Sequence, residues 1–160
     1  MFILQVCKAL EAEKVTYAIV GGYAVALHGV VRGTVDVDIA IQWNLKNLKK
    51  AEKALKELGL ISLLPLDATN IFQFRDEYIA NRNLIAWNFY NPLNPTQQVD
   101  LLINYDLNGP KVTKLIKTGV GSIRILNLDE LVQMKTKSGR PQDLEDVKAL
   151  KQVAKEKKSR

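Results

Sequence analysis

The segment TVDVDIAI, residues 34–41, constrains the fold of this chain most strongly. Its β-branched residues are those that a half-buried strand prefers, yet Asp36 and Asp38 interrupt the apolar pattern. Because side chains alternate between the two faces of a strand, these aspartates are expected on the same face. Two neighbouring like charges are destabilising unless a cation compensates them. The segment therefore predicts a strand with a charged site on one face.

A third aspartate interrupts another apolar segment. Asp100 lies within QVDLLI, and residues 99–103 read as a strand. An adjacent strand that places Asp100 beside Asp36 and Asp38 would complete a site of three carboxylates. Such oxygens suit Mg²⁺ or Mn²⁺, and in two-metal catalysis the ions lie roughly 3.5–4 Å apart. The simpler alternative is that Asp36 and Asp38 face solvent and that Asp100 belongs to an edge.

Gly21 and Gly22 follow a strand predicted at 16–20 and precede a short helix predicted at 24–29. Glycines at such a junction let the backbone approach a phosphate, and a helix N-terminus supplies N–H donors and a favourable dipole. Alone, the pair is most simply a turn. Followed by an Asp-x-Asp strand, it indicates a phosphate-binding turn next to a metal-binding strand.

Periodicity along the chain predicts an α/β (α+β) fold with a mixed β-sheet and flanking helices mainly on one side. The remaining segments are helices at 2–14, 45–58, 129–137 and from Asp143 onward, strands at 61–66, 84–90 and 122–126, a proline-containing loop at 91–97, and an ambiguous stretch at 67–83. Residues 1–160 read as one domain, with 128–158 as a C-terminal helical extension packing on it.

Composition narrows the class of protein. At 160 residues, with 47% hydrophobic and 25% charged residues, the chain matches an ordinary globular protein. The single cysteine, Cys7, excludes an internal disulfide and a cysteine-based zinc cluster, and His28 alone cannot form a histidine-rich metal site. The sequence has no run of 18 apolar residues and no basic n-region at its start, so we expect no membrane contact and a cytoplasmic protein.

The net charge of +6 is unevenly distributed. The last ten residues, KQVAKEKKSR, hold five basic residues and one acidic residue. They are most simply a solvated helix end, and contact with nucleic acid is the alternative.

The stretch VGGYAVALHGVVRGTVDVDIAI, residues 20–41, resembles the signature of the nucleotidyltransferase superfamily with the DNA polymerase β-like catalytic core. Its Gly-Gly-x-Ala and Arg-x-Thr-x-Asp-x-Asp patterns resemble the branch of the AbiE-type toxin nucleotidyltransferases and related small prokaryotic proteins. The resemblance implies that Gly21 and Gly22 contact a nucleoside triphosphate. It also implies that Asp36, Asp38 and Asp100 are the catalytic, metal-binding carboxylates.

A second match lies in residues 128–150, where this branch carries a lysine on one helix and then Arg-x-x-Asp and a further aspartate. Here those residues are Lys135, Arg140, Asp143 and Asp146. Lys135 and Arg140 would neutralise the triphosphate. Asp143 would orient Arg140, cap its helix or help activate an acceptor hydroxyl.

Arg32 and Thr34 complete the candidate nucleotide-binding set. Arg32 would reach a phosphate, with a solvated loop arginine as the alternative, and Thr34 is most simply a strand residue with a local hydrogen bond. The resemblance covers residues 16–41, 98–103 and 128–150, whereas 42–97 match nothing familiar.

These features predict a metal-dependent nucleotidyltransferase that moves a nucleoside monophosphate from an NTP such as ATP to an acceptor hydroxyl. Two Mg²⁺ or Mn²⁺ ions are expected with the NTP. The acceptor is open between tRNA, a protein hydroxyl and a small molecule such as an aminoglycoside, in a toxin–antitoxin or defence setting. The alternative is a non-catalytic module with the same fold that binds nucleotides or a cognate partner protein.

Overall fold

The computed structural model describes residues 1–34, 36–109 and 112–159. Its elements, in chain order, are α1 (Phe2–Ala12), β1 (Tyr17–Val20), α2 (Gly21–Leu27), β2 (Val37–Ile41), α3 (Leu45–Glu57), β3 (Ile61–Ser62), α4 (Ala68–Gln73), α5 (Arg75–Arg82), β4 (Ala86–Asn91), β5 (Asn94–Leu102), β6 (Thr113–Thr118), β7 (Gly121–Leu126), α6 (Leu128–Ser138) and α7 (Pro141–Lys158).

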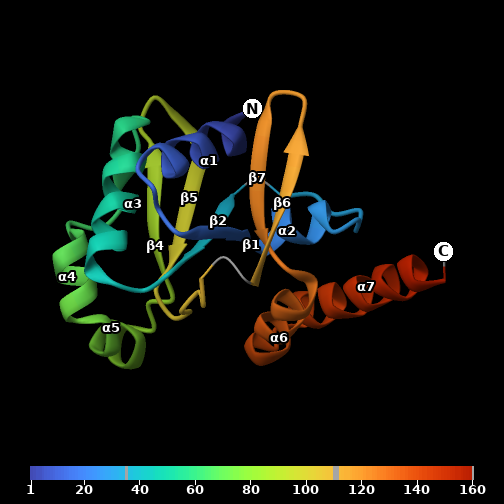
Figure 1. The fold of residues 1–160 in the computed structure, drawn as a ribbon. Coiled ribbons are helices and arrows are strands. Elements are labelled where there is room, and N and C mark those ends of the chain that lie inside the picture. The colour runs from blue at the N-terminus through green and yellow to red at the C-terminus, as the bar shows by residue number, and fades with distance from the viewer. Residues whose placement is uncertain (35, 110–111, 160) are drawn as a thin grey trace.

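In the described part of the chain, the strands form one seven-stranded sheet in the order β3-β4-β5-β2-β1-β7-β6. The pairs β1–β7 and β2–β5 are parallel, and the other neighbours are antiparallel. The predicted α/β fold with a mixed sheet is therefore confirmed. Figure 1 shows α3, α4 and α5 at the left of the sheet and α6 and α7 at the lower right.

Asp38 and Asp100 each lie between buried neighbours in a central strand, as the sequence predicts. In β2, Val37, Ile39 and Ile41 are fully buried, and Asp38, between the first two, is only half-buried. In β5, Val99 and Leu101 are buried on either side of Asp100 in the same way. The buried residues of these strands join those of α1 and α3 in one hydrophobic cluster. The opposite face carries Asp38 and Asp100 together with the buried Ala40.

The predicted loop at 91–97 is wrong. β4 and β5 form a hairpin with a two-residue turn, Pro92 and Leu93, and Asn91 pairs with Asn94 across it. The register then shifts, so that Tyr90 pairs with Gln98, and the residues between lie in an irregular, exposed part of β5. Proline lacks a backbone N–H and is tolerated at such an irregularity, which explains why Pro95 does not end the strand.

Three other segments differ from their sequence patterns. The predicted strand at 61–66 is limited to β3, Ile61–Ser62. The ambiguous stretch at 67–83 contains α4 and α5, and α4 begins with a capping box in which Asp67 and Asn70 each bond the other's backbone N–H. β6 was missed because its lysine-rich, largely exposed sequence lacks an apolar face, as is common in edge strands.

Three helix starts also differ from prediction. α2 begins at Gly21 rather than Ala24, so both glycines belong to its first turn. α6 is capped by Asn127, whose side chain accepts from the Glu130 N–H, and not by Asp129. α7 begins at Pro141, which places Asp143 at the third helical position.

Within the described ranges, no helix is both long enough and apolar enough to cross a membrane.

A buried amide ties the start of β1 to the end of β2. Asn47 of α3 is 6% exposed, and its Nδ2 donates to the carbonyls of Thr16 (3.0 Å) and Gln42 (2.9 Å). Its Oδ1 accepts from the Thr16 N–H at 3.0 Å. One side chain thereby satisfies three backbone groups from two strand ends and fixes α3 against the sheet.

Replacing this amide is expected to destabilise the fold. Asn47→Ala leaves the Thr16 N–H without its acceptor and removes one donor from each of the Thr16 and Gln42 carbonyls, which keep a backbone donor. It should lower the free energy of unfolding by about 1–3 kcal/mol. Urea denaturation measures the change, with Asn108→Ala at an exposed position as the control. Equal stabilities of the two variants would contradict this role of Asn47.

Candidate active site

Strand register brings two of the predicted carboxylates together. β2 and β5 run parallel, with Asp38 paired to Asp100. Aligned residues on neighbouring strands project from the same face, so these side chains lie next to each other although 61 positions separate them in the chain. The two apolar strands that carry Asp38 and Asp100 are therefore adjacent, as the sequence predicts.

Asp36 lies just outside the strand. β2 begins at Val37, so the prediction of a strand from Thr34 is wrong: Asp36 and Thr34 precede β2, and Val35 lies outside the described residues. The Asp36 side chain is exposed. Thr34 makes a local hydrogen bond, with Oγ1 donating to the Asp36 carbonyl at 3.5 Å.

Burial and the charge of Asp100 raise the pKa of Asp36 and Asp38. Burial, together with the nearby Asp100 and Asp36, raises the pKa of Asp38 to about 7, while Lys135 acts in the opposite direction. Burial and Asp100 also raise the pKa of Asp36. The three acids therefore share one electrostatic environment in which a negative charge is unfavourable and a cation is favoured.

Gly21 is in contact with this cluster. It has φ +66°, and a Cβ built there would lie 2.0 Å from Oδ2 of Asp38. Both the left-handed backbone and the close approach of the carboxylate require glycine at this position. The first turn of α2 is thereby held directly against Asp38.

Gly22 is in contact with the other two residues predicted from this region. A Cβ at Gly22 would lie 2.7 Å from both Nη1 of Arg32 and Oγ1 of Thr34. The loop after α2 thus folds back so that a guanidinium and a hydroxyl lie beside the N-terminal turn of the helix. These groups are suited to bind phosphate oxygens.

A buried lysine links the two C-terminal helices. Lys135 of α6 is 6% exposed, and its Nζ lies 2.9 Å from Oδ2 of Asp146 and 3.5 Å from Oδ1 of Asp143, both on α7. Asp146 also pairs with Nε of Arg32 at 3.4 Å and accepts from Gln142. Asp146 therefore connects the loop after α2 to both helices.

Arg140 and Asp143 form the outer part of this network. Nε of Arg140 donates to Oδ2 of Asp143 at 2.8 Å, and the Arg140 backbone N–H donates to the same oxygen at 3.3 Å. Burial alone would raise the pKa of Asp143, but hydrogen bonds from Arg140 and Ser138, with the charges of Arg140 and Lys135, lower it to about 2. Asp143 thus both orients Arg140 and caps α7.

Arg140 is also within electrostatic reach of the carboxylates. Its pKa is raised by the hydrogen bond and charge of Asp143 and, more weakly, by Asp38 and Asp146. Its side chain is 70% exposed, in contrast to that of Lys135. An exposed guanidinium near a carboxylate cluster and held by Asp143 is well placed to meet an anionic substrate.

The structure thus gathers the predicted residues from both ends of the chain, and adds one that the sequence did not indicate. Asn88 of β4 pairs with Asp100, and its Nδ2 donates to Oδ1 of Asp100 at 2.8 Å. In the sequence, Asn88 stands out only as a polar residue between Trp87 and Phe89, both of which are buried in the structure. Nothing in that pattern distinguishes it from an ordinary half-exposed residue.

The carboxylates are not a ready-made metal cage. Among the described residues, no three Asp, Glu, His or Cys side chains are already arranged to hold a metal ion. The donor chemistry nevertheless fits Mg²⁺, which takes few carboxylates and completes its shell with water and substrate phosphates. Burial and the charge of Asp100 raise the pKa of Asp36 and Asp38, and such an ion would offset both effects.

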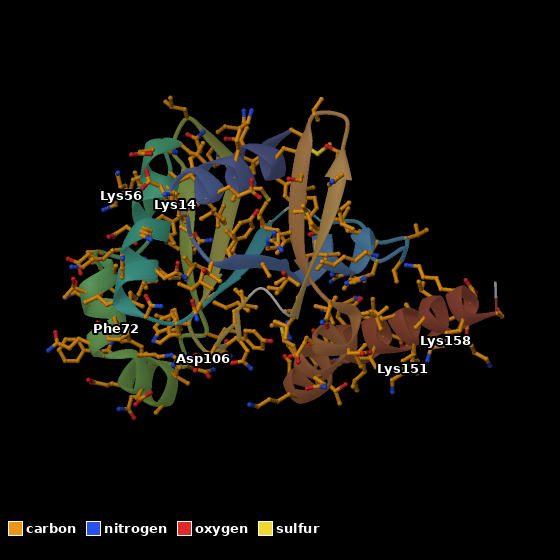
Figure 2. All side chains as sticks on the ribbon, viewed as in Figure 1. Lys14, Lys56, Phe72, Asp106, Lys151 and Lys158 are labelled. Carbon is orange, nitrogen blue, oxygen red and sulfur yellow. The ribbon has the colours of Figure 1, made fainter. Side chains whose placement is uncertain are left out.

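Other candidate residues lie in structural contacts. Nε2 of His28 is 2.8 Å from the Leu126 carbonyl, and its ring is buried. Trp43 stacks on Phe72, with ring centroids 6.1 Å apart, and Arg75 lies 4.2 Å from its ring. Phe72 and Asp106, the ion-pair partner of Arg75, lie on the side of the molecule near α4 and α5 (Figure 2).

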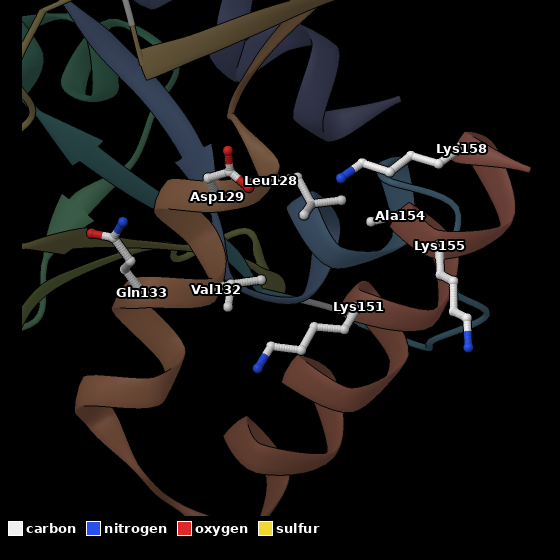
Figure 3. A pocket seen from close by; sticks show the side chains of 8 residues that line it. All are labelled: Leu128, Asp129, Val132, Gln133, Lys151, Ala154, Lys155 and Lys158. Atoms are coloured by element: carbon white, nitrogen blue, oxygen red, sulfur yellow. The ribbon is translucent and has the colours of Figure 1, made fainter.

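A separate groove of about 540 Å³ lies between the C-terminal helices. Lys151, Lys155 and Lys158 of α7 line it together with Leu128 and Val132 of α6, and Lys151 and Lys158 extend toward α6 (Figure 3). Three of the four lysines that the sequence assigns to a solvated end therefore lie on one flank of α7. None of the carboxylates Asp36, Asp38 and Asp100 lines this groove.

Comparisons with known proteins identify the fold. No family model matches the sequence, and no curated protein matches it. A candidate nucleotidyltransferase from Thermotoga maritima matches over 94% of this chain and 89% of its own, with 17% identity and a TM-score of 0.58.

Two antibiotic-modifying enzymes have the same fold. ANT(2″)-Ia, in complex with adenylyl-2″-tobramycin, matches over 91% of this chain and 83% of its own, with 14% identity and a TM-score of 0.58. The lincosamide antibiotic adenylyltransferase LnuA, with lincomycin bound, matches over 91% and 92%, with 15% identity and a TM-score of 0.57. The predicted likeness to the nucleotidyltransferase superfamily is confirmed at the level of the fold.

The contact between Gly21 and Asp38 can be tested with a matched pair of glycines. Gly21 and Gly59 both have positive φ, but a Cβ at Gly59 meets no atom within 4 Å. Gly59→Ala should cost only the backbone strain, about 1–2 kcal/mol. Gly21→Ala should cost about 1–3 kcal/mol more, because the methyl group displaces the Asp38 carboxylate. Urea denaturation of both variants measures the difference, and equal costs would contradict the close contact.

The Asp143 network predicts a pH dependence of stability. Because the folded-state pKa of about 2 lies below the ordinary value of 3.8, Asp143 stabilises the fold above about pH 4 and loses this contribution as the pH falls toward 2. Asp143→Asn should therefore cost roughly 2 kcal/mol at pH 7, and the cost should shrink between pH 4 and pH 3.

Denaturation series at several pH values measure this effect, with Asp129→Asn at an exposed position as the control. A cost that stays constant down to pH 3 would show that the ionisation of Asp143 contributes nothing to stability.

Proposed function

From the nucleotidyltransferase fold of this chain, we propose that the protein transfers a nucleoside monophosphate from an NTP to an acceptor hydroxyl in a reaction that depends on a divalent metal. The observation that carries the proposal is the register pairing of Asp38 with Asp100, directly against the first turn of α2 at Gly21. This arrangement places two carboxylates that favour a bound cation next to a helix turn that can bind phosphate oxygens.

Asp36, Asp38 and Asp100 would hold the metal, two Mg²⁺ or Mn²⁺ ions being expected with the NTP. When bound, the metal would lower the pKa of the acceptor hydroxyl and neutralise charge on the pyrophosphate leaving group. Asp38 and Asp100 would fix its position from β2 and β5, two paired strands in the middle of the sheet. A site on rigid strands holds reacting groups more accurately than a site on loops.

The triphosphate would be bound by residues of α2, of the loop after α2, of α6 and of the start of α7. Gly21 and Gly22 open α2, whose first backbone N–H groups would donate to phosphate oxygens, and Arg32 and Thr34 lie beside Gly22. Lys135 brings a buried positive charge held by two aspartates. Arg140, oriented by Asp143 and largely exposed, would contact the charge that develops on the phosphates during transfer.

The acceptor remains to be found by screening. ANT(2″)-Ia with adenylyl-2″-tobramycin and the adenylyltransferase LnuA indicate ATP as the first donor, and tobramycin and lincomycin as the first acceptors, to test. The AbiE-type resemblance adds tRNA and protein hydroxyls. The toxin–antitoxin setting and a cognate partner protein stay predictions from that resemblance.

Calorimetry with each NTP, with and without Mg²⁺, tests the site directly. Wild-type protein should bind at least one NTP in the presence of Mg²⁺. The double variant Asp36→Asn/Asp38→Asn should lose at least tenfold in affinity, because two of the three proposed ligands no longer carry charge. Asp76→Asn/Glu77→Gln, in the first turn of α5, changes the net charge equally and serves as the control.

Labelled ATP with the three acceptor classes then tests transfer. Incorporation of label that requires Asp38 and Mg²⁺ would support catalysis. Absence of Mg²⁺-dependent NTP binding by the folded wild type would overturn the proposed function and favour a non-catalytic module.

A further inference from the structure

Asn88, Asp100 and Asp38 form a row across three neighbouring strands. β4 pairs with β5 so that Asn88 is opposite Asp100, and β5 pairs with β2 so that Asp100 is opposite Asp38. Aligned positions project from the same face of a sheet, so the amide is next to the carboxylates. Val20, at the end of β1 before Gly21, continues the row beside Asp38.

The amide makes a direct hydrogen bond to the central carboxylate of this row. Nδ2 of Asn88 donates to Oδ1 of Asp100 at 2.8 Å, and the bond is partly buried. A carboxylate without such a bond rotates easily, because the last torsion of an aspartate side chain has broad, two-fold minima. A donor fixed on the adjacent strand selects one orientation.

The chemical type of this donor matters. An amide carries no charge and does not titrate, so it binds Asp100 without neutralising the negative charge that attracts a cation. A lysine or arginine at the same place would compete with a metal ion, and an aspartate would add to the repulsion that already raises the pKa of Asp38. Asparagine orients the carboxylate and leaves its charge available.

We propose that Asn88 is a positioning residue for the metal site, whose amide holds the Asp100 carboxylate in the orientation that binds the ion. This inference rests on the proposed function, since it concerns the metal of that reaction. Partners that orient a metal ligand from outside the coordination shell commonly change metal affinity by about 10–100-fold when they are removed.

The hairpin provides a matched control. Asn91, three residues further along β4, makes a cross-strand bond of the same type, with Nδ2 donating to Oε1 of Gln97 at 2.9 Å. That bond joins two neutral side chains near the turn of the hairpin. Asn91→Ala therefore removes the same kind of bond from the same hairpin, together with a bond from the Leu93 N–H in the turn, without touching a proposed ligand.

Electron paramagnetic resonance of free Mn²⁺ during titration of the full chain gives the affinity for the metal alone. Asn88→Ala should weaken Mn²⁺ binding about tenfold, whereas Asn91→Ala should stay within about twofold of wild type. Thermal melting in EDTA should give similar Tm values for both variants, so that the loss is one of metal affinity and not of folding.

A double-mutant cycle separates orientation from a general effect on β4. In the Asp100→Asn background, Asn88→Ala should cause no further loss of Mn²⁺ affinity, because the ligand that it orients is already altered. Asn88→Gln keeps the amide but moves it by one methylene, so it should also weaken Mn²⁺ binding. This variant replaces Asn88→Ala in the experiment if the alanine variant does not fold.

The contrary outcomes are distinct. If Asn88→Ala binds Mn²⁺ as tightly as wild type, or if both alanine variants lose affinity equally, Asn88 is not a positioning residue and the proposed function still stands. If wild-type protein binds Mn²⁺ neither alone nor together with the NTP that calorimetry identifies, the metal site itself is wrong, and both proposals are overturned.

Discussion

The parallel pairing of β2 with β5 is the interaction on which the rest of this structure depends. It sets Asp38 beside Asp100 in the middle of the sheet, where two apolar strands would otherwise pack in a regular way. The sheet accepts a repulsive pair of acids at the position where hydrophobic neighbours would be most stabilising. Such a departure from local consistency is typical of functional sites, where stability is exchanged for binding or catalysis.

Several features of the fold compensate this repulsion. The charge of Lys135 opposes the rise in the pKa of Asp38. Asp143 and Asp146 in turn form ion pairs with the buried Lys135 ammonium. A buried ion network of this kind is weak as a source of stability, but removing one member leaves an unpaired charge and costs several kcal/mol. The network therefore serves best to fix geometry: it attaches α6, α7 and the loop at Arg32 to one another beside the carboxylates.

The sequence predicted those parts of the site that depend on local spacing. Strand alternation assigned Asp38 and Asp100 to polar positions between buried neighbours, and the structure has them there. The helix after Gly21 and Gly22 was predicted, although its start was placed three residues late. The hairpin at Pro92 was missed because a bulge lets Pro95 lie within β5, an effect of pairing that a proline count cannot reveal.

By itself, the sequence determined which faces are apolar, where glycine replaces side chains and which acids lie two residues apart, because these follow from the periods of strands and helices. Only the tertiary structure decided that Asn88 bonds Asp100 and that Lys135 is buried between Asp143 and Asp146. The bond of Asn88 depends on a register set by the turn and bulge of the hairpin, and the pairs of Lys135 depend on how α6 and α7 pack. Register and packing depend on many contacts between residues that are far apart in the chain, so a local sequence pattern cannot predict them.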